Sequence, residues 1–427
     1  FMKKFLLPLM VTLMLSSTAT SQVLKRLGDR AKQKIEQKAG DKVDQTIDKA
    51  TDGKKKVETE EGEVKEKKDG DEIKVKTESK NVSLKAYSKY DFVPGDRIVY
   101  AEDFAQDVIG EFPLKWNTDG SGEIVTIEGL QGKWLKMNEN TRYESAHNAK
   151  FPENYTIEFD LVAEFKDDQR VPNIDVNIFR STPASPFSGM TLRLTPNGGT
   201  YAEGTRDAAY FFSFDYNGAT HLDSKTQYMS EFFLVNHKAT PVHVSIWVQK
   251  ERVRAWINQA KVYDLPKGMP PNVALDRFGL NIGSYGGARS NYDYFLSNIK
   301  ISVATPDTRS KLITEGKWST TGILFEVNSD KIKPTSYGVL KEIATTLKEN
   351  SDIRVKIIGH TDSDGDDAKN LDLSKRRAAS VRIALTTEFG IDGSRFETDG
   401  AGETKPVADN KTPEGKAQNR RVEFLKL

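Results

Sequence analysis

The spacing of hydrophobic residues changes twice along the chain. In residues 24–50 the apolar positions return every three or four residues, which indicates a helix with a thin apolar stripe. Between residues 96 and 304 they alternate with polar positions in short runs, which is the period of β-strands. From residue 318 to residue 427 strand-like and helix-like runs follow one another. The pattern predicts a multidomain chain with a helical or flexible segment, an all-β domain and an α+β domain.

The middle region, residues 96–304, is predicted to be an all-β sandwich. Its strand-like runs recur between clusters of turn residues, and no helical period interrupts them. The clearest runs cover residues 155–161, 174–179, 190–194, 242–248, 252–257 and 295–301. The stretch 241–266 contains a strand with Trp247, a charged turn and a strand that ends in Trp256-Ile257-Asn258. This pattern resembles the central hairpin of concanavalin A-like jelly rolls, and the resemblance implies a jelly-roll sandwich.

The first 95 residues are predicted to lie outside any packed core. Residues 1–21 have the form of a signal peptide, with Lys3 and Lys4 before an apolar run that is too short to span a bilayer. Residues 22–95 are expected to be a charged helical or flexible segment. Its part from Gln22 to Lys80 has 17 Lys or Arg, 15 Asp or Glu and no aromatic residue, so it cannot bury a core of its own.

Charge and cysteine content narrow the classes of function. The net charge of +1 over 427 residues gives no reason to expect a nucleic acid partner. The absence of cysteine excludes disulfides, thiolate metal sites and a lipidated cysteine. The five histidines do not pair at the spacing of metal ligands, so we expect no metal and no cofactor. With the signal peptide, these features favour a periplasmic protein.

The strongest candidates for binding residues lie between residues 353 and 378. The alternating run 353–358 predicts a strand, and it leads through Gly359-His360-Thr361-Asp362 into an acidic loop. The apolar stripe of residues 373–389 then predicts a helix. A strand–loop–helix unit of this kind brings Asp362 and Arg377, with opposite charges, into one cleft.

Three sequence blocks in this order carry a family resemblance. Gly-His-Thr-Asp at 359–362, Asn-x-x-Leu-Ser-x-x-Arg-Ala at 370–378 and Asn-Arg-Arg-Val-Glu at 419–423 resemble the OmpA-like peptidoglycan-binding domain family. The resemblance covers residues 318–427 and implies an α+β layer sandwich. Residues 305–317 are polar and are expected to be a linker between this domain and the β-sandwich.

The resemblance implies a peptidoglycan site at named positions. In the family an Asp and a helix Arg hold the zwitterionic end of diaminopimelate in the stem peptide, and the matching residues are Asp362 and Arg377. The chemistry is suitable, because a carboxylate attracts an ammonium group and a guanidinium binds a carboxylate with two hydrogen bonds. Thr361, Asn370 and Arg421 match positions that shape the pocket. The alternative is an internal salt bridge between Asp362 and Arg377.

The β-domain offers weaker candidates for chemistry. Glu158, Asp160 and Glu164 approach a glucanase motif but break its spacing, since strand geometry puts the first two about 7 Å apart and Glu164 about 20 Å from Glu158. Retaining glycosidases need carboxyl groups about 5–5.5 Å apart. We therefore expect these acids to lie on a solvent face, opposite a core face of Ile157 and Phe159, and we expect no catalytic residue.

An aromatic stripe allows a second reading of the β-domain. Tyr210, Phe212, Phe214 and Tyr216 alternate on one face of a strand. Aromatic residues dominate sandwich interiors, so we expect this stripe to face the core. The alternative is a surface that stacks sugar rings, which would make the domain a lectin.

The sequence thus favours a non-enzymatic cell-envelope scaffold. It is expected to lie in the periplasm, associated with the outer membrane, and to bind the diaminopimelate of peptidoglycan through residues 318–427. Its β-sandwich would engage another partner, either an outer-membrane protein complex or a glycan. The alternative is a wall-anchored lectin or a glycoside hydrolase.

Overall fold

The structure is a computed structural model, and it describes residues 90–147, 149–165, 171–181, 187–196, 207–229, 240–284, 292–304 and 308–427. The expected signal peptide at 1–21 and the segment 22–89 lie outside these residues. The chain divides into two units, residues 1–79 and 80–427, and the described residues all belong to the second. Within the described ranges, no helix combines the length and the apolar character that a membrane crossing requires.

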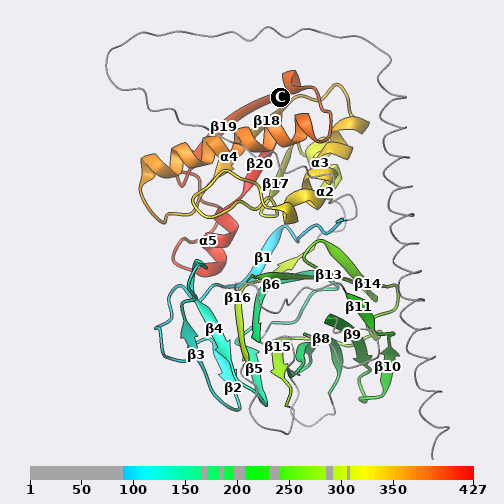
Figure 1. Ribbon diagram of the computed structural model, residues 1–427. Coiled ribbons are helices and arrows are strands. Elements are labelled where there is room, and N and C mark those ends of the chain that lie inside the picture. Colours follow the sequence, from blue (N-terminus) through cyan, green and yellow to red (C-terminus); the bar gives the residue numbers. More distant parts are fainter. Residues whose placement is uncertain are drawn as a thin grey trace, which may run out of the picture. The chain divides into compact units, whose positions relative to one another are not determined.

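The middle region contains two antiparallel sheets (Figure 1). The first sheet has the spatial order β14 (Ala260–Leu265), β13 (Arg252–Ile257), β12 (Val242–Gln249), β6 (Asn154–Phe165), β16 (Tyr292–Val303), β4 (Trp134–Met137) and β3 (Gly122–Val125), with β1 (Arg97–Glu102) also paired to β16. The second has the order β10 (Thr220–Asp223), β9 (Asp207–Phe214), β8 (Gly189–Thr195), β7 (Ile174–Phe179), β15 (Arg277–Ile282), β5 (Thr141–Ser145) and β2 (Trp116–Thr118), with β11 (Gln227–Met229) paired to β9.

The two sheets share one hydrophobic core. Ile157, Phe159 and Leu161 of β6 alternate inward and are fully buried, as the sequence pattern predicts. Phe159 of the first sheet meets Phe278 of the second with ring centroids 5.7 Å apart. Truncation of such a core phenylalanine costs roughly 3–5 kcal/mol. The expected sandwich is therefore confirmed at the level of two packed antiparallel sheets, and its jelly-roll connectivity stays a prediction.

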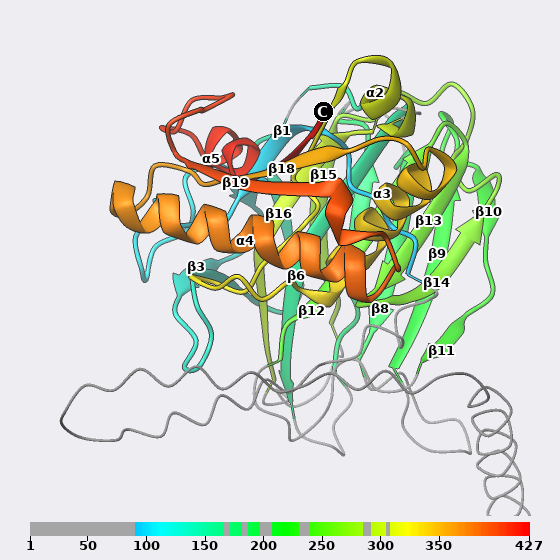
Figure 2. The ribbon, with the colours of Figure 1, turned by 90° about the horizontal axis from the view of Figure 1, so that it is seen from above.

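The C-terminal region is an α+β domain. Its sheet has the order β17 (Lys317–Thr320), β20 (Val422–Lys426), β18 (Val355–His360) and β19 (Phe396–Gly402), with only the β18–β19 pair parallel. The helices are α2 (Thr308–Thr314), α3 (Tyr337–Glu349), α4 (Asp367–Thr387) and α5 (Pro413–Asn419), with short 3₁₀ turns at Pro334–Ser336 and Gly393–Arg395. Figure 2 shows α4 running along β19. Val381 and Leu385 of α4 bury their side chains with Ile357 of β18 in the core of this domain.

Local signals explain where these elements begin. Helix α4 starts six residues before the apolar stripe because the Asp366 side chain caps it, accepting a hydrogen bond from the Lys369 amide at 3.0 Å. The run 323–327, whose apolar residues favour a strand, forms only an isolated bridge from Phe325 to Ile332. The carbonyl oxygen of Lys331 accepts a hydrogen bond from the Glu326 amide, so this stretch is a tight turn. The first strand of the sheet is β17 instead.

Two stretches that were expected to be unstructured pack against the domains. The predicted linker 305–317 contains α2, and Leu312 is fully buried in the C-terminal core. Residues 90–95, assigned to the flexible segment, include Phe92, which packs on Trp256 with ring centroids 5.3 Å apart. Lys311 and Asp96 form an ion pair at 2.6 Å. The apolar side chains that anchor these stretches are Leu312 in the first and Tyr90 and Phe92 in the second.

Strand β1 is joined to helix α5 of the C-terminal domain. The amide of Ile98 donates to Gln418 Oε1 at 2.8 Å, and the amide of Ala101 donates to Glu414 Oε1 at 3.3 Å. Ile98 and Ala101 also form a small apolar cluster with Ala417. Side chains of helix α5 therefore accept hydrogen bonds directly from backbone amides of strand β1.

Candidate functional site

The loop after β18 is fixed by the elements around it. Thr361 is buried, and its amide donates to the Gly402 carbonyl oxygen of β19 at 2.9 Å. Asn370 is also buried, and its side-chain amide donates to Glu403 Oε2 at 2.6 Å and to the Asp364 carbonyl oxygen at 3.1 Å. Thr361 and Asn370 thus hold the loop that presents Asp362.

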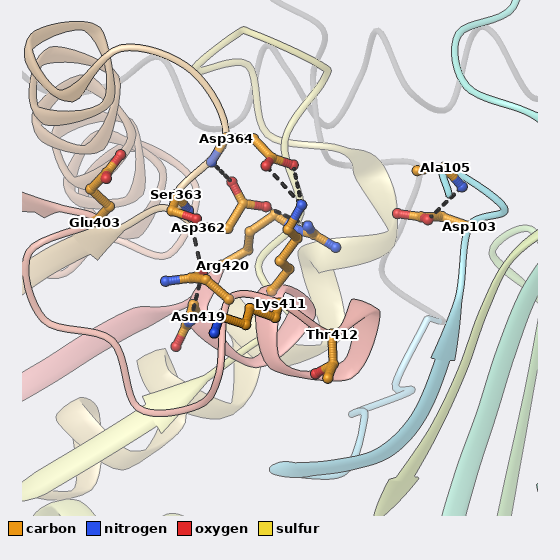
Figure 3. A network of polar contacts seen from close by, with 12 residues as sticks. Asp103, Ala105, Asp362, Ser363, Asp364, Glu403, Lys411, Thr412, Asn419 and Arg420 are labelled. Atoms are coloured by element: carbon orange, nitrogen blue, oxygen red, sulfur yellow. Dashed lines mark hydrogen bonds and ion pairs between the residues drawn. The ribbon is translucent and has the colours of Figure 1, made fainter. Parts of the chain in front are cut away.

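Asp362 forms an ion pair with Arg420 (Figure 3). Arg420 Nη1 donates to Asp362 Oδ2 at 2.5 Å, a charge-assisted hydrogen bond. The Asp362 side chain is 12% exposed and the Arg420 side chain 42% exposed. The pair therefore has a buried acid and a cation that solvent can reach.

Arg377 lies close to Asp362 without touching it. Its Nε donates to the Ser329 carbonyl oxygen at 3.0 Å, and its guanidinium lies 4.9 Å from the centre of the Phe325 ring. Burial lowers the pKa of the half-buried Arg377 guanidinium, while the charge of Asp362 acts in the opposite direction. Among the described residues, the two terminal amino groups of Arg377 have no hydrogen-bond partner. The internal Asp362–Arg377 salt bridge is thus not formed.

Arg421 is turned into the domain. It is 4% exposed, and its Nη2 lies 2.7 Å from Glu423 Oε1 and 3.1 Å from the Lys405 carbonyl oxygen. His360 packs beside this pair and is also buried; its burial and the Arg421 charge lower the pKa of its imidazole to about 4. Arg421 therefore supports the sheet under the loop rather than presenting its charge to the site.

The extra acids of the loop have partners in the protein. Asp364 pairs with Lys416 of α5 at 2.7 Å (Figure 3), and Asp366 caps α4. These two carboxylates are engaged by the fold, so their charge near Asp362 is partly compensated.

Arg377 and Arg420 open into a cavity of about 1180 Å³. One wall comes from the C-terminal domain and also includes Lys333. The other wall comes from the sandwich and includes Asp160 and Asn298. The two cations beside Asp362, Arg377 and Arg420, thus face a space that is large enough for a ligand.

Below this cavity, the outer face of the first sheet holds a buried charged cluster. Glu158 is 3% exposed, and its carboxylate lies 3.1 Å from Lys300 Nζ and 3.5 Å from His243 Nε2. Asp160 accepts from His243 Nδ1 at 2.7 Å and from Asn298 at 2.8 Å. The prediction that Glu158 faces solvent is wrong. The alternation of β6 shows which side chains face the core, but it does not show what covers the opposite face of the sheet.

The cluster is ionised at neutral pH. Burial opposes the charge of Glu158, but Lys300 and His243 outweigh it and lower the pKa of Glu158 to about 2. Burial likewise opposes the His243 cation, but Asp160 and Glu158 raise the pKa of His243 to about 9. A carboxyl group that stays ionised cannot donate a proton to a leaving group, so Glu158 is unsuited to the role of a general acid.

The aromatic stripe of β9 lies on the outer face of the second sheet, contrary to expectation. Phe211 is fully buried, whereas Tyr210, Phe212 and Phe214 are half-buried. Their rings form a row, with centroids 5.5 Å apart for Tyr210–Phe212 and 5.6 Å for Phe212–Phe214, which Phe187 continues at 5.8 Å. Both faces of β9 carry phenylalanine, so alternation alone could not choose between them.

Arg420 is the candidate residue that the sequence pattern did not single out. Val422 and Phe424 point into the core, which puts Arg421 and Glu423 on the same opposite face of β20. Opposite charges two residues apart on one strand face pair readily. That pattern indicates that Arg421 is internal, but it does not connect Arg420 with Asp362.

Comparison with known proteins assigns the C-terminal domain. The OmpA family matches residues 324–420. The chain is 37% identical over 166 residues to the outer-membrane lipoprotein YfiB of Pseudomonas aeruginosa, covering 38% of this chain and 97% of the relative. It is 40% identical over 103 residues to the peptidoglycan-binding protein ArfA of Mycobacterium bovis, covering 24% of this chain and 31% of the relative.

A solved structure is also similar to part of the chain. The cell wall anchor of the T6SS from Pseudomonas aeruginosa is 32% identical, and the match covers 26% of this chain and 80% of that chain with a TM-score of 0.24. The chain spans 29%, 46% and 31% of the lengths of the first three curated relatives that it matches. With a family match over the loop that follows β18, α4 and α5, and a relative covered almost completely, the chain belongs to the OmpA family.

Proposed function

We propose that this chain is a non-enzymatic cell-envelope protein that binds the diaminopimelate of peptidoglycan and links its β-sandwich to the wall. The observation that carries the proposal is the arrangement of Asp362, Arg377 and Arg420, here called the clamp. One buried carboxylate stands beside two guanidinium groups, and one of these has unpaired terminal amino groups. Such an arrangement suits a ligand end that carries an ammonium and a carboxylate close together.

The binding step follows from the charges. The ligand ammonium approaches Asp362, whose carboxylate retains acceptor positions besides the one that Arg420 occupies. The ligand carboxylate is held by the terminal amino groups of Arg377, with Arg420 free to turn toward it because its side chain is 42% exposed. Thr361, Asn370 and Arg421 act as positioning residues, since their bonds fix the loop and the sheet beneath it.

The family and its named relatives support this proposal. One relative is named as a peptidoglycan-binding protein and another as an outer-membrane lipoprotein. By this analogy we place the chain in the periplasm, associated with the outer membrane. The contacts between β1 and α5 would then transmit a load from the sandwich, and from any outer-membrane complex that it engages, to the wall.

Co-sedimentation with purified sacculi tests the proposal. Each charged contact that Asp362 or Arg377 makes with the ligand is worth roughly 2–5 kcal/mol when one partner is removed, which corresponds to about 30-fold or more in affinity. Asp362→Ala and Arg377→Ala should therefore each nearly abolish co-sedimentation while circular dichroism shows a folded chain. Arg376→Ala is the matched control, because Arg376 lies beside Arg377 but pairs with Asp372 on the exposed face of α4. Wild-type sedimentation by both clamp variants would refute the assignment.

The half-buried aromatic row favours a second candidate function, glycan binding by the sandwich. Sugar rings stack on aromatic faces, and Arg193 with Asp175 lies next to Phe212 as a polar neighbour. A glycan array probed with Phe212→Ala tests it, with Tyr228→Ala as control because Tyr228 is 57% exposed but belongs to β11. Loss of a glycan signal in the first variant alone supports a lectin, and a reducing-sugar assay would reveal turnover by a hydrolase.

A further inference from the structure

The cavity next to the clamp is larger than the clamp needs. At about 1180 Å³ it exceeds the usual size of a site for a drug-sized molecule, roughly 300–1,000 Å³. Arg377 and Arg420 line it, and it extends from them to strands β1, β6, β12 and β16 of the sandwich. The end of one amino acid held at the clamp would leave most of this volume to solvent.

The sandwich wall of the cavity contains a buried carboxyl group with one unused oxygen. Glu102 of β1 is 4% exposed, and its Oε1 accepts from the Phe104 amide at 3.0 Å. Its Oε2 is buried and has no hydrogen-bond partner in the part of the chain that the structure describes. Burial raises the pKa of Glu102 to about 7. A buried acceptor without a partner destabilises the fold, so its position in a cavity wall points to a donor that arrives with a ligand.

The opposite wall contains an unpaired cation. Lys333 follows the turn 326–331, and Figure 1 shows this C-terminal part of the chain as a body with its own sheet and helices. Its amide bonds to the Leu324 carbonyl oxygen. Among the described residues the Lys333 ammonium has no hydrogen bond or ion pair, although it acts on Asp160 through space. The neighbouring Lys331, in contrast, pairs with Glu326 at 2.7 Å and does not line the cavity.

Acceptor and cation face one space that is continuous with the clamp. A peptide has amide N–H groups for a carboxyl oxygen, and an acidic peptide has a carboxylate for an ammonium. A neutral glycan offers hydroxyl groups but no charge for Lys333. We propose that the sandwich completes the ligand site, and that the cavity takes the acidic peptide attached to the clamped end, with Glu102 accepting from its backbone and Lys333 binding its carboxylate.

This inference rests on the proposed function, because the clamp must hold diaminopimelate for the attached peptide to reach the cavity. It assigns to the β-sandwich a direct part in ligand recognition. The charged cluster of Glu158, His243 and Lys300 then forms the floor of the cavity rather than a binding group, since its charges are already paired.

Calorimetric titration of the full chain with two probes tests the inference. One probe is free meso-diaminopimelate, which can fill only the clamp, and the other is the tripeptide L-alanyl-γ-D-glutamyl-meso-diaminopimelate. The wild-type chain should bind the tripeptide about tenfold or more tightly than the free amino acid, as expected for charged hydrogen bonds gained in the cavity.

Two variants and two controls make the outcome specific. Glu102→Gln and Lys333→Gln should each reduce tripeptide affinity about tenfold and leave the affinity for free diaminopimelate within about twofold. Glu123→Gln, an exposed acid on β3, and Lys331→Gln should change neither affinity. Thermal melts should show both cavity variants folded.

The titrations distinguish a failure of this inference from a failure of the proposed function. If the wild-type chain binds both probes but Glu102→Gln and Lys333→Gln bind the tripeptide as the wild type does, the cavity takes no part in binding. The same conclusion holds if the two probes bind the wild type equally. If the wild-type chain binds neither probe, the clamp assignment itself is wrong.

Discussion

The clamp of the C-terminal domain and the charged cluster of the sandwich use similar residues in opposite ways. In the clamp, Asp362 contacts one cation that is 42% exposed, and Arg377 keeps two amino groups unpaired. In the cluster, Glu158 and Asp160 share His243, and Lys300 pairs with Glu158; the His243 and Lys300 side chains are 16% and 17% exposed. An exposed ion pair exchanges partners at little cost, whereas a buried one leaves an uncompensated charge when it opens. A binding site is therefore recognised by incomplete pairing and not by the number of charges.

The largest expected effect concerns the cluster. Lys300→Met removes the cation nearest to Glu158, and breaking a buried pair costs roughly 3–5 kcal/mol. Urea unfolding followed by tryptophan fluorescence should show a loss of this order in the transition of the sandwich. Lys136→Met is the control, because Lys136 pairs with Asp293 where the side chains are 32% and 41% exposed, and less than about 1 kcal/mol should be lost. Equal losses of stability in the two variants would contradict the difference between the buried and the exposed ion pair.

The pH dependence of stability gives the next effect. The folded-state pKa of His243 is raised to about 9 from an ordinary value of 6.5, so its stabilising contribution is fully present below pH 6.5 and is lost as pH rises through 9. Between pH 6 and pH 10 the wild type should lose up to about 3 kcal/mol more than His243→Gln, which has no titrating group at this position. Parallel pH profiles for the two proteins would show that His243 is not held as a cation.

Substitution of the adjacent residues Arg420 and Arg421 should affect stability and binding differently. Arg421→Gln breaks the buried pair with Glu423 and should lower the free energy of unfolding by about 2 kcal/mol. Arg420→Gln should cost less than about 0.5 kcal/mol of stability but weaken sacculus binding roughly tenfold. Chemical denaturation and co-sedimentation on both variants check this, and the reverse order in either assay would move Arg421 into the clamp.

The smallest effect is expected in the acidic loop. Asp364→Asn removes the ion pair with Lys416, in which the Asp364 side chain is 65% exposed. Such pairs contribute roughly 0–1 kcal/mol. The thermal midpoint and the amount of protein that sediments with sacculi should both stay near the wild-type values. A clear loss of binding would mean that Asp364 contacts the ligand.

Local sequence signals predicted the parts of the site that one short segment builds. Asp362 and Arg377 come from a strand, a turn and a helix that follow each other directly, so their proximity follows from the spacing alone. Arg420 lies 58 residues from Asp362, and no local pattern connects them. The burial of Glu158 depends on what covers the outer face of a sheet, which strand alternation cannot indicate.

The same limit explains the errors in the fold. Alternation gave the core face of β6 correctly, because Thr156, Glu158 and Asp160 make that part of its other face polar. It failed for β9, where Tyr210, Phe212 and Phe214 give the outer face more aromatic residues than the inner face, which has Phe211. The stretch 305–317 was expected to be a linker because it is polar, but Leu312 alone is enough to seat α2 on the C-terminal core.

The measurement that most directly tests the central claim compares two ligands on the wild-type chain. One stem tripeptide ends in meso-diaminopimelate, and the other has L-lysine at that position. Lysine keeps an ammonium group for Asp362 but lacks the carboxylate that Arg377 would bind, a loss of roughly 2–5 kcal/mol. Calorimetry should therefore give an affinity at least about 30-fold higher for the diaminopimelate peptide. Equal affinities would contradict a clamp that grips an ammonium and a carboxylate together.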